Sequence, residues 1–168
     1  MSKMPPKAAG RSDHFQTPEF EISRLFPYIP KTWKIWENAC GAGRIVNALK
    51  TADYDVIGTD IMHGFDFLSP LMPLPEFDCI LTNPPFSVKD KWLARCFEIG
   101  KPFALLMPIT ALGEQDRVSM YKKHGIQVAL PPGRINFETP SGKGSGAWFY
   151  SAWFCHGLPL PGQITVLD

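Results

Sequence analysis

Short apolar segments with strand character alternate with helical segments along most of the sequence, and this alternation limits the fold more than any other feature. Strands are expected at 33–36, 55–58, 77–82 and 103–107, and helices at 44–50, 88–99 and 112–123. Strands that are separated by helices need crossover connections, which place the strands parallel in one sheet. The sequence therefore predicts an α/β fold whose mostly parallel sheet carries helices on both faces.

The two ends of the chain depart from this pattern. Two strands, at 127–130 and 148–154, follow each other without a helix, so we expect an antiparallel hairpin at the edge of the sheet. The glycine-rich and proline-rich segment 131–146 between them is too long for a tight turn, and loops of that length tend to be functional or mobile. Residues 1–12, with two prolines and three basic side chains, predict a flexible N-terminal arm. Thr17 and Pro18 are expected to open a short helix with Phe20, Leu25 and Phe26 on its apolar side.

Composition bounds the class of protein. The chain has 168 residues, of which 45% are hydrophobic and 20% charged, so residues 13–168 are expected to form a single domain with its own core. The formal net charge is +1, so contact with a nucleic-acid backbone would have to be local. The four cysteines and four histidines show no zinc-site spacing, and no metal is expected. Without a signal peptide or a long apolar span, we expect a cytoplasmic protein with no membrane association.

A glycine turn follows the first predicted strand, where residues 35–43 read Ile-Trp-Glu-Asn-Ala-Cys-Gly-Ala-Gly. Gly41 and Gly43 let a ligand approach the main chain, and the start of the next helix adds unpaired N–H groups. The dinucleotide pattern G-x-G-x-x-G fails because Val46 stands at its third glycine, which favours a ligand without a pyrophosphate. Asp60 ends the second strand, where an acidic residue accepts hydrogen bonds from ribose hydroxyls. The two strand ends predict a nucleoside site, the alternative being a plain turn beside a solvated carboxylate.

The tetrapeptide Asn83-Pro84-Pro85-Phe86 follows the third predicted strand and carries the most specific chemical signal in the chain. The two prolines have fixed φ angles and no N–H, so the turn is stiff and offers carbonyl acceptors without competing donors. The Asn83 side-chain oxygen and the Pro84 carbonyl are expected to accept the hydrogens of an sp² amine and to free its lone pair for attack on a sulfonium methyl group. Phe86 is expected to stack on a planar base, which must leave a duplex to reach it.

Together, these motifs resemble those of the S-adenosylmethionine-dependent adenine-N6 DNA methyltransferases, in particular small enzymes of phage and prophage type. The resemblance implies a Rossmann-like class I methyltransferase fold, with residues 13–168 as one catalytic domain and no separate target-recognition domain. It implies S-adenosylmethionine as the cofactor and methyl transfer to N6 of adenine in DNA. Its catalytic motif matches Asn83, Pro84, Pro85 and Phe86. The cofactor positions that it implies are Phe15, Thr17 and Pro18; Glu37, Ala39, Cys40, Gly41 and Gly43; Asp60 and Ile61; and Asp66 and Phe67.

Several alternatives stay open at the level of sequence. RNA adenine methyltransferases share the tetrapeptide, so the preference for DNA over RNA is an expectation. Protein-glutamine methyltransferases carry a related motif that usually ends in tyrosine, and a non-catalytic subunit with the same fold is a further alternative.

Arg134 and Lys143, in the glycine-rich loop, are expected to contact the nucleic-acid backbone near the sheet edge that holds Asn83. A homo-oligomer or a separate partner chain stays open as the source of target recognition.

Overall fold

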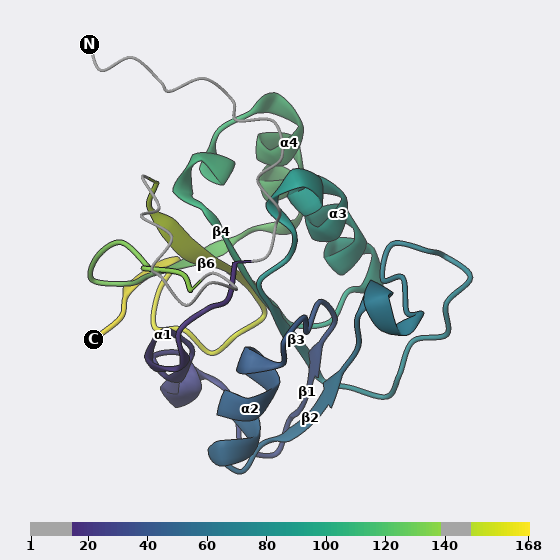
Figure 1. The fold of residues 1–168 in the computed structure, drawn as a ribbon. Helices are drawn as coiled ribbons and strands as arrows, with labels where there is room; N and C mark the ends of the chain where they lie inside the picture. Colours follow the sequence, from purple (N-terminus) through teal and green to yellow (C-terminus); the bar gives the residue numbers. More distant parts are fainter. Residues whose placement is uncertain (1–14, 139–148) are drawn as a thin grey trace.

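The computed structural model describes residues 15–138 and 149–168, which form a seven-stranded sheet between two helical layers (Figure 1). The strands are β1 (Lys34–Glu37), β2 (Asp55–Gly58), β3 (Cys79–Thr82), β4 (Phe103–Pro108), β5 (Gln127–Leu130), β6 (Ser151–His156) and β7 (Ile164–Val166). The α-helices are α1 (Glu19–Ser23), α2 (Arg44–Thr51), α3 (Lys89–Ile99) and α4 (Gln115–His124). Short 3₁₀ helices, η1 (Phe26–Tyr28), η2 (Ile61–His63), η3 (Phe86–Val88) and η4 (Ile109–Leu112), connect them. The predicted N-terminal arm and Lys143 lie outside the described residues.

The strand order is β2-β1-β3-β4-β6-β5-β7, and β6 alone runs against the other strands of the described chain. The mostly parallel sheet and the antiparallel pairing of β5 with β6 confirm the predicted topology. The sheet continues past this pair, because β7 lies parallel to β5 and forms the edge. The sequence did not indicate β7, since its three residues are too few for a periodic pattern.

Two cores, one on each face of the sheet, hold the helices in place. Ile22 of α1 and Leu49 of α2 pack with Leu106 and other side chains on one face. Leu93 of α3 and Phe154 of β6 belong to the core on the opposite face, where α4 also packs. Figure 1 shows α1 and α2 on one side of the sheet and α3 and α4 on the other. Helices therefore cover both faces, as the sequence predicted.

The start of the described chain differs from its prediction in two details. Pro18 stands at the N-cap of α1 with an extended backbone, φ −60° and ψ 142°, so Thr17 lies too early to cap the helix. The buried Thr17 hydroxyl has no hydrogen-bond partner within the described ranges. Phe20 is 56% exposed, whereas Leu25 is buried as predicted, and Ile22 of α1 is buried with it. Among residues 15–138 and 149–168, no helix has both the length and the apolar character needed to cross a membrane.

Candidate active site

The site lies where three parallel strands end side by side. The residues that follow β1, β2 and β3 meet at one edge of the sheet, because these strands point the same way. Thr59 N donates to the Glu37 carbonyl at 2.8 Å, and Cys40 N donates to the Thr59 carbonyl at 3.0 Å. These two hydrogen bonds extend the β1–β2 pairing beyond the strands and hold the glycine turn against the residues that precede Asp60.

The glycine turn has the backbone geometry that its sequence predicts. Gly41 and Gly43 adopt φ angles of +47° and +80°, which favour glycine, and Gly43 caps α2. A Cβ atom at Gly41 would lie 3.3 Å from the side-chain nitrogen of Gln16, so the N-terminal segment closes over this turn. Gly58 takes the packing role of the missing third glycine, because a Cβ there would approach Val46 of α2 to 2.9 Å.

Asp60 joins the ends of β1 and β2 through its carboxylate. One oxygen accepts from Gly41 N at 2.8 Å, and the other accepts from Met62 N at 2.9 Å. A carboxylate has about four acceptor positions, so two remain for a ligand. Asp60 is only 8% exposed, and it lines both of the cavities that open at this edge of the sheet. It is therefore fixed by the backbone and still able to accept hydrogen bonds from hydroxyl groups.

Two adjoining cavities open at this edge. The first, the Asp66 cavity, has a volume of about 490 Å³, and the second, the Asn83 cavity, about 160 Å³. They share four lining residues, Ala39, Asp60, Ile61 and Pro85. The Asp66 cavity is lined in addition by Asn38, Phe65, Asp66, Phe67, Leu68, Val88, Lys91 and Trp92, and the Asn83 cavity by Phe15, Gln16, Gly41, Met62 and Asn83. Together they form one elongated site with a wide end and a narrow end.

The wide end is built on an aromatic layer. Phe67 contacts the ring of Trp36 in β1 at 5.4 Å and the ring of Trp92 in α3 at 4.7 Å between centroids. These contacts position Asp66, whose Oδ1 accepts from Leu68 N at 3.0 Å. Within the described residues no other donor to Asp66 is found, so its second oxygen is available to a ligand amine in the cavity.

The narrow end is organised around the side chain of Asn83. Its nitrogen Nδ2 donates to the main-chain oxygen of Phe15 at 3.0 Å. Because a carbonyl oxygen only accepts hydrogen bonds, this contact fixes the orientation of the amide. Oδ1 of Asn83 is buried and has no partner among the described residues. The cavity therefore holds a desolvated, oriented acceptor, which is costly unless a ligand donates to it.

Glu37 lies beneath the site and lines neither cavity. Its Oε1 accepts from Ala39 N at 3.0 Å and from the hydroxyl of Thr82, the residue before Asn83. The pKa of Glu37 is raised from 4.5 to about 7, mainly by burial. Hydrogen bonds from Thr82 and Ala39 oppose this rise, and the nearby charge of Asp60 adds to it. Glu37 thus connects the glycine turn with the end of β3 from below.

Phe86 packs in a cluster of aromatic rings and lines neither cavity. Its ring is stacked on Phe15 at 5.9 Å, with 29° between the planes, and meets Phe149 and Phe137 edge-on. Glu138 contacts two segments in the same region. Its main-chain N–H and carbonyl both form hydrogen bonds with the main chain of Gln16, at 2.9 Å each, and its carboxylate forms an ion pair with Arg44 of α2. The segment after β5 and the segment before α1 therefore meet beside Asn83.

The structure brings half of the eighteen predicted site residues to these cavities. Nine of them line a cavity: Phe15, Ala39, Gly41, Asp60, Ile61, Asp66, Phe67, Asn83 and Pro85. Seven others line neither cavity and lie next to lining residues in the chain or in space: the buried residues Thr17, Pro18, Glu37 and Pro84, and Cys40, Gly43 and Phe86. Arg134 is exposed and lies over the ring of Tyr150, 6.0 Å from its centroid.

Some lining residues were not indicated by the sequence. Gln16 and Asn38 stand inside predicted motifs, and their polar side chains could have drawn attention there. Trp92 and Lys91 belong to α3 and carry no local signal. Met62, which the sequence did not indicate either, is 78% exposed and lines the Asn83 cavity. It lies next to the predicted residue Ile61, which is 69% exposed and lines both cavities.

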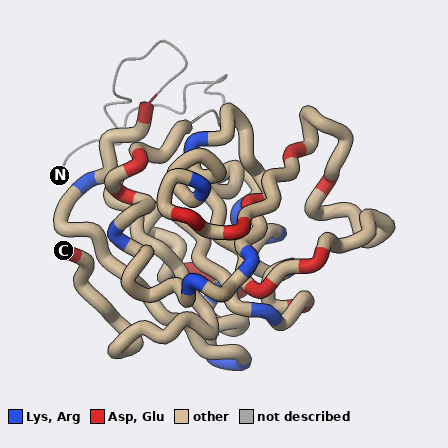
Figure 2. Tube along the Cα trace, turned by 90° about the horizontal axis from the view of Figure 1, so that it is seen from below, with Lys and Arg blue, Asp and Glu red and all other residues tan. Residues whose placement is uncertain are grey.

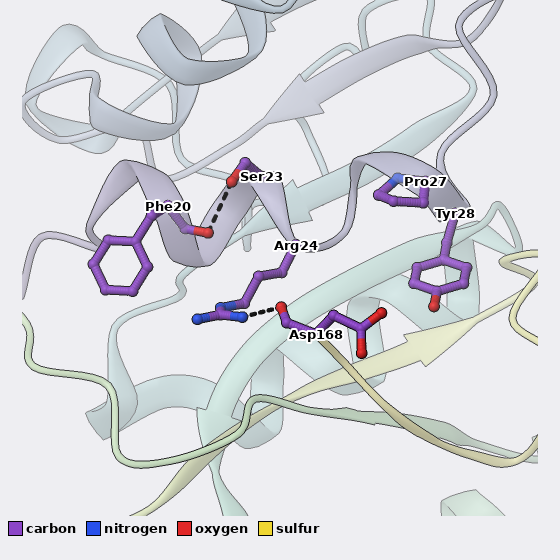
Figure 3. Close-up of a pocket in the computed structure, with 6 residues that line it drawn as sticks. All are labelled: Phe20, Ser23, Arg24, Pro27, Tyr28 and Asp168. Carbon is purple, nitrogen blue, oxygen red and sulfur yellow. Dashed lines mark hydrogen bonds between the residues drawn. The ribbon is translucent and has the colours of Figure 1, made fainter.

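Other parts of the molecule were searched for comparable sites. A cavity of about 430 Å³, lined by α1, η1 and Asp168, shares no residue with the site above (Figure 3). There Ser23 donates to the Phe20 carbonyl at 2.9 Å, and Arg24 donates to the Asp168 carbonyl. No group of three or more potential metal ligands occurs in the described ranges. Basic and acidic positions are interspersed along the trace (Figure 2).

Comparisons with known proteins identify the fold. No protein-family model matches the sequence, and no match is found among curated proteins. A type I restriction-modification system methyltransferase subunit from Streptococcus thermophilus aligns with a TM-score of 0.59 at 14% identity, over 92% of this chain and 47% of that one. A dimethyladenosine transferase from Plasmodium falciparum gives 0.51 at 11% identity, over 86% and 62%. A predicted O-methyltransferase, Atu636 from Agrobacterium tumefaciens, gives 0.51 at 12%, over 88% and 84%.

These likenesses define the class of fold, and the chain has the Rossmann-like methyltransferase fold that its sequence predicted. The chain spans less than half the length of the type I subunit and less than two thirds of the dimethyladenosine transferase. Because the names of the similar structures include enzymes for different acceptors, the choice of acceptor has to be argued from the site.

Proposed function

We propose that this chain is an S-adenosylmethionine-dependent methyltransferase that acts on the N6 amine of adenine in DNA. The observation that carries the proposal is the buried Oδ1 of Asn83, which has no partner among the described residues. It belongs to a side chain that the Phe15 carbonyl orients and that lines a cavity adjoining a larger one of about 490 Å³.

The paired cavities fit the cofactor. S-adenosylmethionine supplies a methyl group on a positively charged sulfonium. Asp60 is placed to accept from ribose hydroxyls, and the free oxygen of Asp66 is placed to accept from the adenine amine. Ile61 and Pro85 line both cavities and offer apolar surface to the nucleoside. The carboxylate of Asp60 also lies at the junction, where it favours a cationic tail.

The geometry of Asn83 suits activation of an amine. An exocyclic amine is a weak nucleophile because its lone pair is delocalised into the ring. Oδ1 of Asn83 accepts one amine hydrogen, and we assign the second to the Pro84 carbonyl. The nitrogen then becomes pyramidal, and its lone pair forms a bond to the methyl carbon as the carbon–sulfur bond breaks and its electron pair stays on sulfur. The extra proton on the methylated amine leaves to water.

DNA is the acceptor that we favour on present observations. The type I subunit belongs by name to a restriction-modification system, and the other adenine-related name is a dimethyladenosine transferase. Arg134 stands exposed beside Tyr150, which is itself 57% exposed and directly precedes β6. A cation and an aromatic ring are the groups that contact phosphates and unstacked bases. Selection of the target sequence is assigned to a second copy of this chain or to a partner chain.

A labelled-methyl transfer assay tests the proposal. The protein is incubated with methyl-labelled S-adenosylmethionine and, in separate reactions, duplex DNA, total RNA or a protein extract, and nucleic-acid products are digested to nucleosides. We expect label in N6-methyladenine from DNA, and transfer about 10²–10³ slower by the Asn83→Ala variant. Label in RNA adenine alone would change the substrate but retain the chemistry. Label in glutamine, or none in any acceptor although cofactor binds, would overturn the proposal.

A further inference from the structure

The Asp66 cavity contains a second oriented amide, on Asn38. This side chain is 1% exposed, and its Oδ1 accepts from the indole nitrogen of Trp92 at 2.9 Å. An indole N–H can only donate, so the oxygen must face Trp92 and the nitrogen must face the other way. Nδ2 of Asn38 has no hydrogen-bond partner in residues 15–138 or 149–168.

A buried amide nitrogen without a hydrogen-bond partner destabilises the fold, so this position favours a ligand that supplies an acceptor. Asn38 lines the Asp66 cavity together with Asp60 and Asp66. The two carboxylates accept hydrogen bonds and therefore suit the hydroxyl and amine donors of a ligand. Asn38 Nδ2 supplies the opposite property, a donor for an acceptor on the same ligand.

We propose that Asn38 Nδ2 donates a hydrogen bond to a ring nitrogen of the cofactor's adenine, with Trp92 as the residue that positions it. The inference rests on the cofactor of the proposed function and adds an adenine contact to it. An adenosine moiety offers donors to Asp60 and Asp66 and ring nitrogens as acceptors, which matches the polarity of all three side chains. Trp92 also contacts Phe67, the neighbour of Asp66, so one side chain of α3 aligns both adenine contacts.

Calorimetry with S-adenosylhomocysteine tests the contact without any methyl transfer. Three further ligands are the analogues in which N1, N3 or N7 of the adenine is replaced by CH. The wild-type protein should bind one of the three about tenfold more weakly than S-adenosylhomocysteine. Asn38→Ala should bind S-adenosylhomocysteine about tenfold more weakly than wild type, and it should no longer distinguish that one analogue from it.

The matched variant is Asn38→Asp, which keeps an oxygen for Trp92 and replaces the donor by a second oxygen that carries negative charge. It should bind S-adenosylhomocysteine at least as weakly as Asn38→Ala, whereas Asn136→Ala, an exposed asparagine, should bind like wild type. Thermal unfolding without ligand shows whether each variant is folded. Wild-type affinity in folded Asn38→Asp, or an analogue penalty that is the same in wild type and Asn38→Ala, overturns the assignment. Neither outcome depends on the methyl acceptor, so a failed methylation assay is a separate result.

Discussion

Nδ2 of Asn83 donates to the main-chain oxygen of Phe15 at 3.0 Å, across 68 positions of sequence. This contact fixes the orientation of the amide and leaves Oδ1 buried without a hydrogen-bond partner among the described residues. In the proposed reaction, the backbone before α1 therefore holds the acceptor in the orientation that an amine requires.

Replacing Asn83 should affect turnover far more than cofactor binding. Asn83→Ala removes an acceptor that we assign to the transition state, and losing one such group costs about 10²–10³ in rate. Asn83 is assigned to the amine, and the adenosine contacts of the cofactor are assigned to Asp60 and Asp66, so the dissociation constant for the cofactor should stay near that of wild type. Single-turnover kinetics and calorimetry measure the two quantities. A variant with an unchanged rate constant would remove Asn83 from the mechanism.

Replacing Asp60 should have the opposite effect. Asp60→Ala removes a charged acceptor for the ribose, which should weaken cofactor affinity by about 1.5–3 kcal/mol, with a smaller change in rate at saturation. The same change releases the N–H groups of Gly41 and Met62, so Asp60→Asn, which retains one acceptor oxygen, should lose less. Calorimetry on both variants is the check, and an unchanged dissociation constant for Asp60→Ala would contradict the assignment.

The Phe15–Phe86 stack leads to a prediction about base placement. Phe15 already covers one face of Phe86 at 5.9 Å, so a target base that stacks on Phe86 must displace the Phe15 ring. Phe86→Ala should weaken binding of the extruded base by about 1–3 kcal/mol, whereas Phe86→Tyr should retain it. Phe15→Ala keeps the carbonyl that orients Asn83 and should bind the base at least as well as wild type. A fluorescent adenine analogue in duplex DNA reports the extruded base. Equal damage from Phe86→Ala and Phe86→Trp would show that Phe86 only packs in the cluster.

The buried carboxyl of Glu37 should make stability depend on pH. Its pKa rises from 4.5 in the unfolded chain to about 7 in the fold, mainly because burial disfavours its charge. The folded state therefore binds the proton more tightly, so this stabilisation is complete below pH 4.5 and is lost as pH rises to about 7. Glu37→Gln cannot ionise, and its unfolding free energy should lack this decline. Urea unfolding across that range measures the difference, and parallel curves for both proteins would contradict it.

Arg134 should contribute to nucleic-acid binding and not to cofactor binding. Neutralising it in Arg134→Gln should reduce the salt dependence of DNA binding by about one phosphate contact, and adding Lys143→Gln should raise this to about two. Arg134 lines neither cavity, so the cofactor dissociation constant should not change. Binding titrations over a range of salt concentrations test this. The parent's slope in the double variant would place the DNA contact elsewhere.

The strand ends could be anticipated from sequence because their signals are local. Gly41, Asp60 and Asn83 each follow an apolar strand, and parallel strands bring such positions to one edge. The fold class followed from the same alternation. The part of the site that depends on single residues at strand ends can therefore be predicted from sequence.

What the sequence did not indicate depends on contacts between distant segments. The orientation of Asn83 needs the Phe15 carbonyl, and that of Asn38 needs the indole of Trp92, 54 residues away. Phe86 was expected to present a face to a base, and only the packed structure places Phe15 on it. None of these relationships leaves a periodic or compositional trace in the chain.

The pairing of Gln16 with Glu138 has a consequence for how the protein becomes active during synthesis. A nascent chain that ends before residue 138 already contains the glycine turn, Asp60 and Asn83, but it lacks the partner that anchors the segment carrying Phe15. Most of the chain must therefore be synthesised before this pairing can stabilise the orientation of the Asn83 amide. A chain that ends before Glu138 would keep both partners of the Phe15–Asn83 hydrogen bond but would lack the Gln16–Glu138 pairing that anchors the segment with Phe15.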